Sequence, residues 1–344
     1  MVTQPASAAI AGAPFNPQPA IGIGDQFGNI RSSANGTADN STVVTAARSG
    51  GTGTLQGTLT ATAANGVATL TNLFHTNANT ITISFTSGTL TNASANILVN
   101  PAAADRLVFT NQPGSGVTGA PLTTQPAVHT RDQFGNDSAS GLPPTLNLTM
   151  SLGSGSGPLL GTTITNIGTV GANGVVAFTD LRVDSVGTDK RLTATVTGPP
   201  ELLSATSDLF SVGKGNQTIT FPSLPNRVYG EVFTLTSTAS SGLPVSFAIV
   251  SGPASLSNSV ITVTGIGTVT VRTNQAGDTN FNAAADVDRS FTATKANVTV
   301  SLGSSPNPSL PDQQVGFNDH KRRRSRKWRA GWFGAIQGQR VCAR

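Results

Sequence analysis

The residues with the most potential for chemistry are two copies of a motif, Asp-Gln-Phe-Gly-Asn, at residues 25–29 and 132–136. Asp and Asn side chains near a glycine can supply oxygen ligands to Ca²⁺. The same residues form tight turns, because Asp caps its own backbone and Gly and Asn tolerate positive φ. Calcium usually takes six or more oxygens, and each copy contains one acid. The sequence therefore favours a structural turn that Phe27 and Phe134 anchor in a core.

A second loop, "QAGDTNFNAA", contains Asp278 and Asn280, again with a single acid. We expect Phe281 to plug the end of a β-sandwich there. Asp286 and Asp288 follow at period two, which places both carboxylates on one solvated strand face. The pattern favours a structural loop over a metal site.

No arrangement of residues predicts catalysis. His75 and His129 occupy non-equivalent positions without a Cys or paired carboxylate beside them, so we expect surface or half-buried strand residues. No G-x-S-x-G follows a strand, and "GSGSG" at 153–157 is not followed by a helix, as a nucleotide-binding loop would be. No carboxylate pair stands out for glycoside hydrolysis. We therefore expect no enzyme and no cofactor, and assign no catalytic, cofactor-binding or metal residue.

Composition limits the partners. Residues 1–317 carry twelve Lys and Arg against fifteen Asp and Glu, whereas nine Lys and Arg and one Asp lie in residues 318–344. The body thus lacks the basic stripe of a nucleic-acid binder. Cys342 is the only cysteine, which excludes an internal disulfide framework. No run of 18 apolar residues exists, so we expect no membrane span, and the first residues do not resemble a signal peptide.

The elements that must position these residues are β-strands. Segments such as "TITISFT", "RLTATVT" and "SVITVTGIGTVTVRT" alternate apolar and polar residues with period two, which is typical of half-buried antiparallel strands. Asn-Gly, Gly-Pro and Ser-Gly pairs separate them, and no long window has helical spacing. The predicted fold class is all-β.

Internal repeats set the domain size. "TQPASAAIAGAPFNPQPAIGIGDQFGN" matches "TNQPGSGVTGAPLTTQPAVHTRDQFGN", and "NGVATLTNL" matches "NGVVAFTDL", with a period of about 107 residues, the size of one immunoglobulin-like (Ig-like) sandwich. The first copy lacks most of the opening strand "DRLVF" that the second has. The predicted parts are repeat 1 (1–102, N-terminally truncated), repeat 2 (103–213), a third domain (214–295), the first strand of a truncated further repeat (296–317) and a basic tail (318–344).

Two resemblances follow from these motifs. The pattern "QP…AG…QPAV…DQFGN…NGVA" resembles the bacterial Ig-like repeats of invasin and intimin stalks. "SSGLPVSF", "SGPASL", "VTGIGTVTV" and "QAGDTNFNAA" resemble a bacterial Ig-like module of the MBG type, and "SSPNPSLPDQQVGF" resembles the first strand of a further Ig-like repeat. The resemblances imply tandem β-sandwiches in a beads-on-a-string rod, with an extracellular or bacterial cell-surface location.

The basic tail has two interpretations. "KRRRSRK" with Trp328, Trp332 and Phe333 is a composition that binds phosphates and stacks on bases. Alternatively, the tail is a frameshift, because a one-base shift permits "GSGVPVGSVQFKVNGSAL", which alternates like a strand and continues the interrupted repeat. The abrupt change of composition favours the frameshift, and we expect the tail to be disordered.

The sequence thus predicts a non-catalytic spacer or stalk of a bacterial cell-surface or secreted protein. Its partners would be neighbouring Ig-like repeats and, in one alternative, host, matrix or glycan ligands bound by loops, as in an adhesin. A second alternative is the stalk of a surface enzyme whose catalytic domain lies outside this chain. Nucleic acid is not an expected partner.

Overall fold

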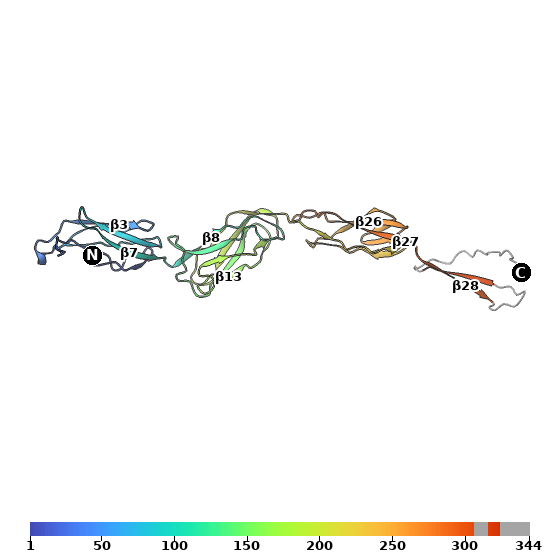
Figure 1. Ribbon diagram of the computed structural model, residues 1–344, viewed down its shortest axis with the longest axis horizontal. Helices are drawn as coiled ribbons and strands as arrows, with labels where there is room; N and C mark the ends of the chain where they lie inside the picture. The colour runs from blue at the N-terminus through green and yellow to red at the C-terminus, as the bar shows by residue number, and fades with distance from the viewer. Residues whose placement is uncertain (306–315, 324–344) are drawn as a thin grey trace. The chain divides into compact units, whose positions relative to one another are not determined.

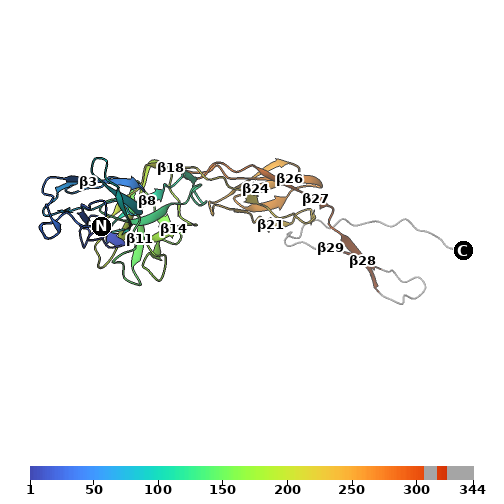
Figure 2. The same ribbon diagram turned by 60° about the vertical axis from the view of Figure 1, so that its left-hand side comes forward.

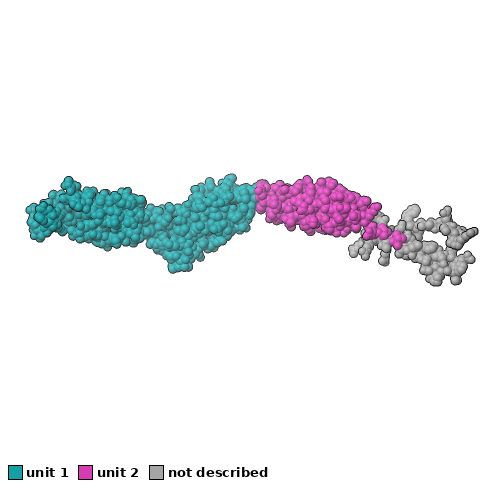
Figure 3. All heavy atoms as spheres, in the orientation of Figure 1, with its two compact units in different colours: residues 1–215 teal, residues 216–344 magenta. Residues whose placement is uncertain are grey.

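The computed structural model describes residues 1–305 and 316–323. The chain divides into two compact units, Met1–Gly215 and Asn216–Arg344 (Figure 3). No helix in these described ranges is long and apolar enough to cross a bilayer.

Repeat 1 consists of seven strands and one short 3₁₀ helix, because its β-branched residues alternate with small polar ones. Five strands form a sheet in the order β1-β7-β6-β3-β4, and β2 pairs with β5 (Figure 1). The elements are β1 (Ala8–Ile10), β2 (Ala20–Gly22), η1 (Ser33–Asn35), β3 (Val43–Gly50), β4 (Thr60–Thr62), β5 (Val67–Thr69), β6 (Thr80–Thr86) and β7 (Ala93–Asn100).

Repeat 2 has the same plan with additional strands. Its large sheet has the order β13-β11-β16-β18-β9, with β17 also paired to β16, and its second sheet has the order β14-β10-β8 (Figure 2). A further pair joins β12 and β15. The strands are β8 (Ala104–Asn111), β9 (Gly116–Val117), β10 (Ala127–Asp132), β11 (Asn147–Ser154), β12 (Leu159–Leu160), β13 (Ile164–Asn166), β14 (Val175–Ala177), β15 (Arg182–Val183), β16 (Gly187–Val196), β17 (Ala205–Thr206) and β18 (Phe210–Gly213).

Both repeats contain the same pair of hydrogen bonds between a glutamine side chain and the backbone of a distant leucine. Gln18 Nε2 donates a hydrogen bond to the Leu73 carbonyl (3.1 Å), and the Leu73 amide donates to Gln18 Oε1 (2.9 Å). Gln125 and Leu181 make the same pair of bonds at 3.0 and 3.0 Å. Each part-buried amide side chain is therefore satisfied by backbone from a distant part of its repeat. The "QP" of the sequence repeat is thus a structural residue pair in both copies.

The second unit contains a third sandwich. Its sheets have the orders β20-β27-β26-β23, β21-β25-β24 and β19-β22. The strands are β19 (Ile219–Thr220), β20 (Arg227–Val228), β21 (Val232–Thr234), β22 (Thr238–Ala239), β23 (Ser246–Ser251), β24 (Ala254–Ser257), β25 (Val260–Val263), β26 (Gly267–Asn274) and β27 (Val287–Thr294).

The described residues contain three separate hydrophobic cores. One comprises residues between Ala11 and Val99, the second residues between Ala104 and Val212, and the third residues between Phe221 and Ala293. Each core fills the space between the sheets of one sandwich, which is how two-layer β-domains bury their inward faces.

The last described elements are β28 (Val298–Ser305) and β29 (Gly316–Arg323), which pair antiparallel in the register Val298↔Arg323 to Ser305↔Gly316. The expected boundary at residue 318 falls within β29, and the division of the chain into these parts stays a prediction. Backbone hydrogen bonds make this pairing and do not require apolar side chains. The remaining tail prediction, for residues 324–344, lies outside the described residues.

Candidate functional site: the two Asp-Gln-Phe-Gly-Asn loops

Both copies of the motif form the same turn. Asp25 Oδ1 accepts hydrogen bonds from the amides of Phe27 and Asn29, each at 2.9 Å. Asp132 Oδ1 accepts the equivalent bonds from Phe134 and Asn136, also at 2.9 Å. The glycine of each loop has φ near +90°, a region that suits glycine. The turn predicted from the sequence is confirmed.

The aspartates differ in their second oxygen. Asp132 is fully buried, and its Oδ2 accepts hydrogen bonds from the Ala102 amide (2.9 Å) and Asn136 Nδ2 (2.8 Å). Asp25 is exposed, and its Oδ2 accepts one longer bond, 3.3 Å, from Asn29 Nδ2. Asp132 thereby holds the segment that leads from repeat 1 into repeat 2.

Asn136 extends this contact into repeat 1. Its Nδ2 donates to the Thr76 carbonyl (2.8 Å), and its Oδ1 accepts from the Ala78 amide (2.8 Å). On the other side of the loop, Arg106 Nη2 donates a hydrogen bond to the Gln133 carbonyl at 2.6 Å. These contacts, together with Asp132, form what we call the inter-repeat joint. Asn29 makes its side-chain contact within its own loop.

The phenylalanines correct one expectation. Phe27 is 79% exposed and Phe134 40% exposed, so neither ring anchors its turn in a core. A Cβ built on Gly12 of repeat 1 would lie 2.2 Å from Phe134 Cζ. The Phe134 ring therefore packs against the backbone of the neighbouring repeat. The rings sit at the tips of tight turns, which carry them away from the sheets of their own sandwich.

The carboxylate oxygens of both loop aspartates accept hydrogen bonds from N–H donors. The hydrogen bond from the Asn29 amide is the main cause that holds the pKa of Asp25 below its ordinary value, because hydrogen bonds to a carboxylate stabilise its charged form. Donors already occupy both oxygens of Asp132. Residues 1–305 and 316–323 contain no group of three or more His, Cys, Asp or Glu that could hold a metal ion.

The histidines lie apart. His75 is fully buried, contrary to the expected surface or half-buried position, and its ring nitrogens lie 3.0 Å from the Thr54 carbonyl and 2.8 Å from the Thr52 carbonyl. It follows buried Leu73 at period two, so alternation directs it inward. His129 is part-buried, with Nδ1 3.6 Å from Asp137.

The loop in the second unit is also a turn. Asp278 Oδ1 accepts hydrogen bonds from the amides of Asn280 (2.8 Å) and Phe281 (2.7 Å). Phe281 is half-buried.

The two acids that follow this loop lie on one face, as predicted. Asp286 and Asp288 both approach Arg272, at 3.3 and 2.8 Å. Solvent screens ion pairs as exposed as these, so they contribute little to stability.

Two buried ionisable residues of the described ranges were not singled out from the sequence. Lys190 is fully buried and its Nζ donates to the Ser156 carbonyl at 2.6 Å. The sequence signal for the burial of Lys190 was its period-two spacing with Leu192 and Ala194, which are also buried on β16.

The other missed residue is Asp39, which caps the segment before β3. Its oxygens accept bonds from the Ser41 amide and from the amide and hydroxyl of Thr42, and they pair with Arg31. These bonds, the Thr42 amide first, lower the pKa of Asp39 to about 2. The signal was the spacing Asp-x-x-Thr, a local capping pattern.

No protein-family model matches the chain, and no curated protein matches it. Solved structures do. A protocadherin gammaB7 EC3-6 cis-dimer structure is 13% identical and covers 93% of this chain and 84% of its own, with a TM-score of 0.26. The structure of Drosophila OTK extracellular domains 3–5 is 10% identical, and the match covers 86% of this chain and 96% of that one, with a TM-score of 0.23. A C-terminal 282-residue intimin fragment, solved with the intimin-binding domain of Tir, is 12% identical. The match covers 58% of this chain and 67% of that one, with a TM-score of 0.22.

Matches with TM-scores this low carry no argument about function. The class of fold depends on the sheets described above: each sandwich buries a core of its own between antiparallel-rich sheets. The chain is all-β and built of tandem Ig-like domains, which confirms the predicted fold class.

Proposed function

We propose that this chain is a non-catalytic spacer, a stalk segment of a secreted or cell-surface bacterial protein. In this proposal residues 1–213 are two invasin/intimin-style repeats and residues 214–295 an MBG-type module. The motifs quoted from the sequence support these subtypes. A spacer needs domains that fold independently and joints that limit bending, and it needs no reactive residue.

The inter-repeat joint is the observation that carries the proposal. Asp132 is a charged residue with no exposure, and it bonds to the Ala102 amide of the connecting segment. Asn136 bonds to two backbone groups of repeat 1, at Thr76 and Ala78. Several directional bonds to backbone, made at once, restrict the angle between two domains more than a flexible linker does.

The test measures how far repeat 1 moves relative to repeat 2 in the full chain. Nitroxide labels are placed on cysteines that replace the exposed Thr60 and Thr206, after Cys342→Ser removes the natural cysteine. Pulsed electron paramagnetic resonance then gives the distribution of label-to-label distances. Asn136→Ala removes two bonds to repeat 1, and the matched control, Asn29→Ala, removes a bond within its own loop.

We expect a narrow distribution in the parent chain and in Asn29→Ala, and one at least twofold wider in Asn136→Ala. A parent distribution as broad as a flexible linker between the two repeats would give would overturn the proposal, since a joint that does not restrict motion cannot make a spacer. Equal widths for the two variants would overturn the role of Asn136. The adhesin and enzyme-stalk alternatives stay predictions.

A further inference from the structure

The sequence contains three Asn-Gly pairs, at residues 35–36, 65–66 and 173–174. An asparagine that precedes glycine can lose its side-chain amide without an enzyme, because the next backbone nitrogen reaches the side-chain carbonyl carbon and glycine has no Cβ to obstruct it. The reaction requires that the glycine amide is open to water and that the backbone around it can turn. The surroundings of each pair therefore decide whether it reacts.

The pair at residues 65–66 is held in a turn. The Gly66 amide donates a hydrogen bond to the Asp39 carbonyl at 2.8 Å, and Asn65 Oδ1 accepts one from the Ser33 amide at 2.6 Å. Gly66 is buried, and a Cβ built on it would lie 2.4 Å from the Arg31 carbonyl oxygen. The Gly66 nitrogen thus already has an acceptor, and the side chain that it would attack is fixed.

The pair at residues 173–174 occupies the equivalent turn of repeat 2. The Gly174 amide donates to the Ile167 carbonyl at 2.9 Å, and Gly174 is buried. A Cβ built on Gly174 would lie 2.4 Å from Thr130 Oγ1. This turn therefore protects its glycine amide in the same way as the turn of repeat 1.

The pair at residues 35–36 lies in a different environment. Asn35 is the last residue of η1, and both Asn35 and Gly36 are exposed. Apart from its chain neighbours, no heavy atom of the described residues lies within 4 Å of a Cβ built on Gly36. Gly36 has φ of 123° and ψ of −130°, a conformation that is open to glycine alone. Water and backbone motion thus reach this pair.

We propose that Asn35 is a site of spontaneous deamidation, at which water converts the side-chain amide into a carboxylate. The Gly36 nitrogen loses its proton to a base in solvent and attacks Asn35 Cγ. The N–Cγ bond forms, the Cγ–Nδ2 bond breaks, and the nitrogen leaves as ammonia with a proton from water. Water then opens the cyclic imide at one of its two carbonyls, which leaves an aspartyl or an isoaspartyl residue at position 35. The proposal does not depend on the spacer function.

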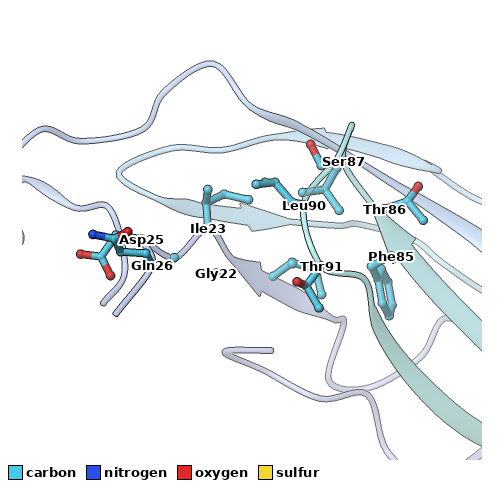
Figure 4. A pocket seen from close by; sticks show the side chains of 12 residues that line it. Gly22, Ile23, Asp25, Gln26, Phe85, Thr86, Ser87, Leu90 and Thr91 are labelled. Carbon is cyan, nitrogen blue, oxygen red and sulfur yellow. The ribbon is translucent and has the colours of Figure 1, made fainter. Parts of the chain in front are cut away.

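The conversion removes a donor and adds a negative charge. Asn35 Nδ2 donates a hydrogen bond to the Ile30 carbonyl at 3.1 Å, and an ionised carboxylate cannot replace this donor. Ile30 forms a bridge with Gly24 across the first Asp-Gln-Phe-Gly-Asn loop. Figure 4 shows Asp25 and Gln26, the first residues of that loop, beyond the end of β2. The modification therefore removes a contact with the base of this loop.

The test incubates the folded full chain at mildly alkaline pH and follows all three asparagines in one sample. Peptide-mapping mass spectrometry gives the rate of each conversion, and electron-transfer fragmentation distinguishes aspartyl from isoaspartyl products. Asn65 and Asn173 are internal controls with the same following residue. We expect Asn35 to convert at least about tenfold faster than either control, because the two turns must open before their glycine amides can react. Equal rates in the folded chain, or a slower rate at Asn35, would overturn the proposal.

The same chain unfolded in urea separates structure from local sequence. We expect the three rates to become similar there, and an equal advantage of Asn35 in urea would show that the fold does not select the site.

A variant identifies the attacking atom. Gly36→Ala places a methyl group beside the nitrogen and should lower the rate at Asn35 at least about tenfold. Unchanged slow rates at Asn65 and Asn173 show that this variant is folded. An undiminished rate at Asn35 in Gly36→Ala would exclude the Gly36 amide as the nucleophile and overturn the mechanism.

Discussion

The loops at residues 25–29 and 132–136 have the same sequence and the same turn, but only one of them holds two domains together. In both, the first carboxylate oxygen accepts two amide bonds at 2.9 Å. The difference lies in the second oxygen and in the asparagine, which face backbone groups of repeat 1 when the loop belongs to repeat 2. The motif therefore specifies a turn, and the neighbouring repeat makes the turn into a joint.

The largest expected effect separates the two aspartates. Asp132→Asn replaces Oδ2, the acceptor for the Ala102 amide and Asn136 Nδ2, by an NH₂ group that faces these donors. We expect a loss of about 2–4 kcal/mol in the stability of repeat 2, because buried donors are left unpaired. Asp25→Asn keeps the two Oδ1 bonds and should have a much smaller effect.

Calorimetry of the full chain measures this comparison, with hydrogen exchange at Ala102 and Phe134 to assign the change to the joint, because a multidomain chain does not unfold in two states. Equal shifts for Asp132→Asn and Asp25→Asn would show that the joint adds nothing to the turn.

The next effect concerns the packing of Phe134 on Gly12. Gly12→Ala places a Cβ 2.2 Å from Phe134 Cζ, at a residue with φ of +79°. We expect a cost of about 1–3 kcal/mol from the contact and the backbone together. Gly119→Ala, at the equivalent residue of repeat 2 with φ of +83°, is the control for the backbone part.

A double-mutant cycle with Phe134→Ala isolates the contact. The alanine should relieve part of the cost of Gly12→Ala, and strictly additive losses would contradict direct packing between the two residues.

These differences explain which features of the fold and of the loops could be predicted from the sequence. The turn was predictable, because Asp132 contacts Phe134 and Asn136 within four residues, and the strands were predictable from alternation. The joint was not, because its partners are backbone groups of residues such as Thr76 and Ala102, which have no sequence signature and lie 30 to 60 residues away. Phe134 was misjudged for the same reason, because apolar character does not reveal which domain a ring contacts. Phe27 was misjudged because its turn leaves the ring in solvent, at 79% exposure.

A smaller effect distinguishes the repeats in acid. Hydrogen bonds from Thr42 and Ser41 lower the pKa of Asp39 to about 2. In repeat 2 the counterpart of Thr42 is Leu146. Pro143 lies three residues before it, at the position that Asp39 has in repeat 1. Because the folded pKa lies below the ordinary value, the charged Asp39 stabilises repeat 1 above about pH 4, and this contribution is lost as the pH falls from about 4 to 2.

We expect the unfolding temperature of repeat 1 to fall in that pH range more than that of repeat 2, as followed by calorimetry. Asp39→Asn is the control and should flatten the difference. If Asp39→Asn keeps the full pH dependence of the unfolding temperature of repeat 1, other acids cause that dependence.

The smallest effect is expected at Phe27, and it sharpens the comparison most directly. Phe27 is 79% exposed, so Phe27→Ala removes little packing and should change stability by less than about 0.5 kcal/mol. Phe134→Ala removes a ring that is 60% covered and contacts Gly12, and should cost about 1–2 kcal/mol. Thermal unfolding of the two variants measures the difference. If Phe27→Ala proves as costly as Phe134→Ala, the ring serves the turn itself, and the joint is not what distinguishes two loops of identical sequence.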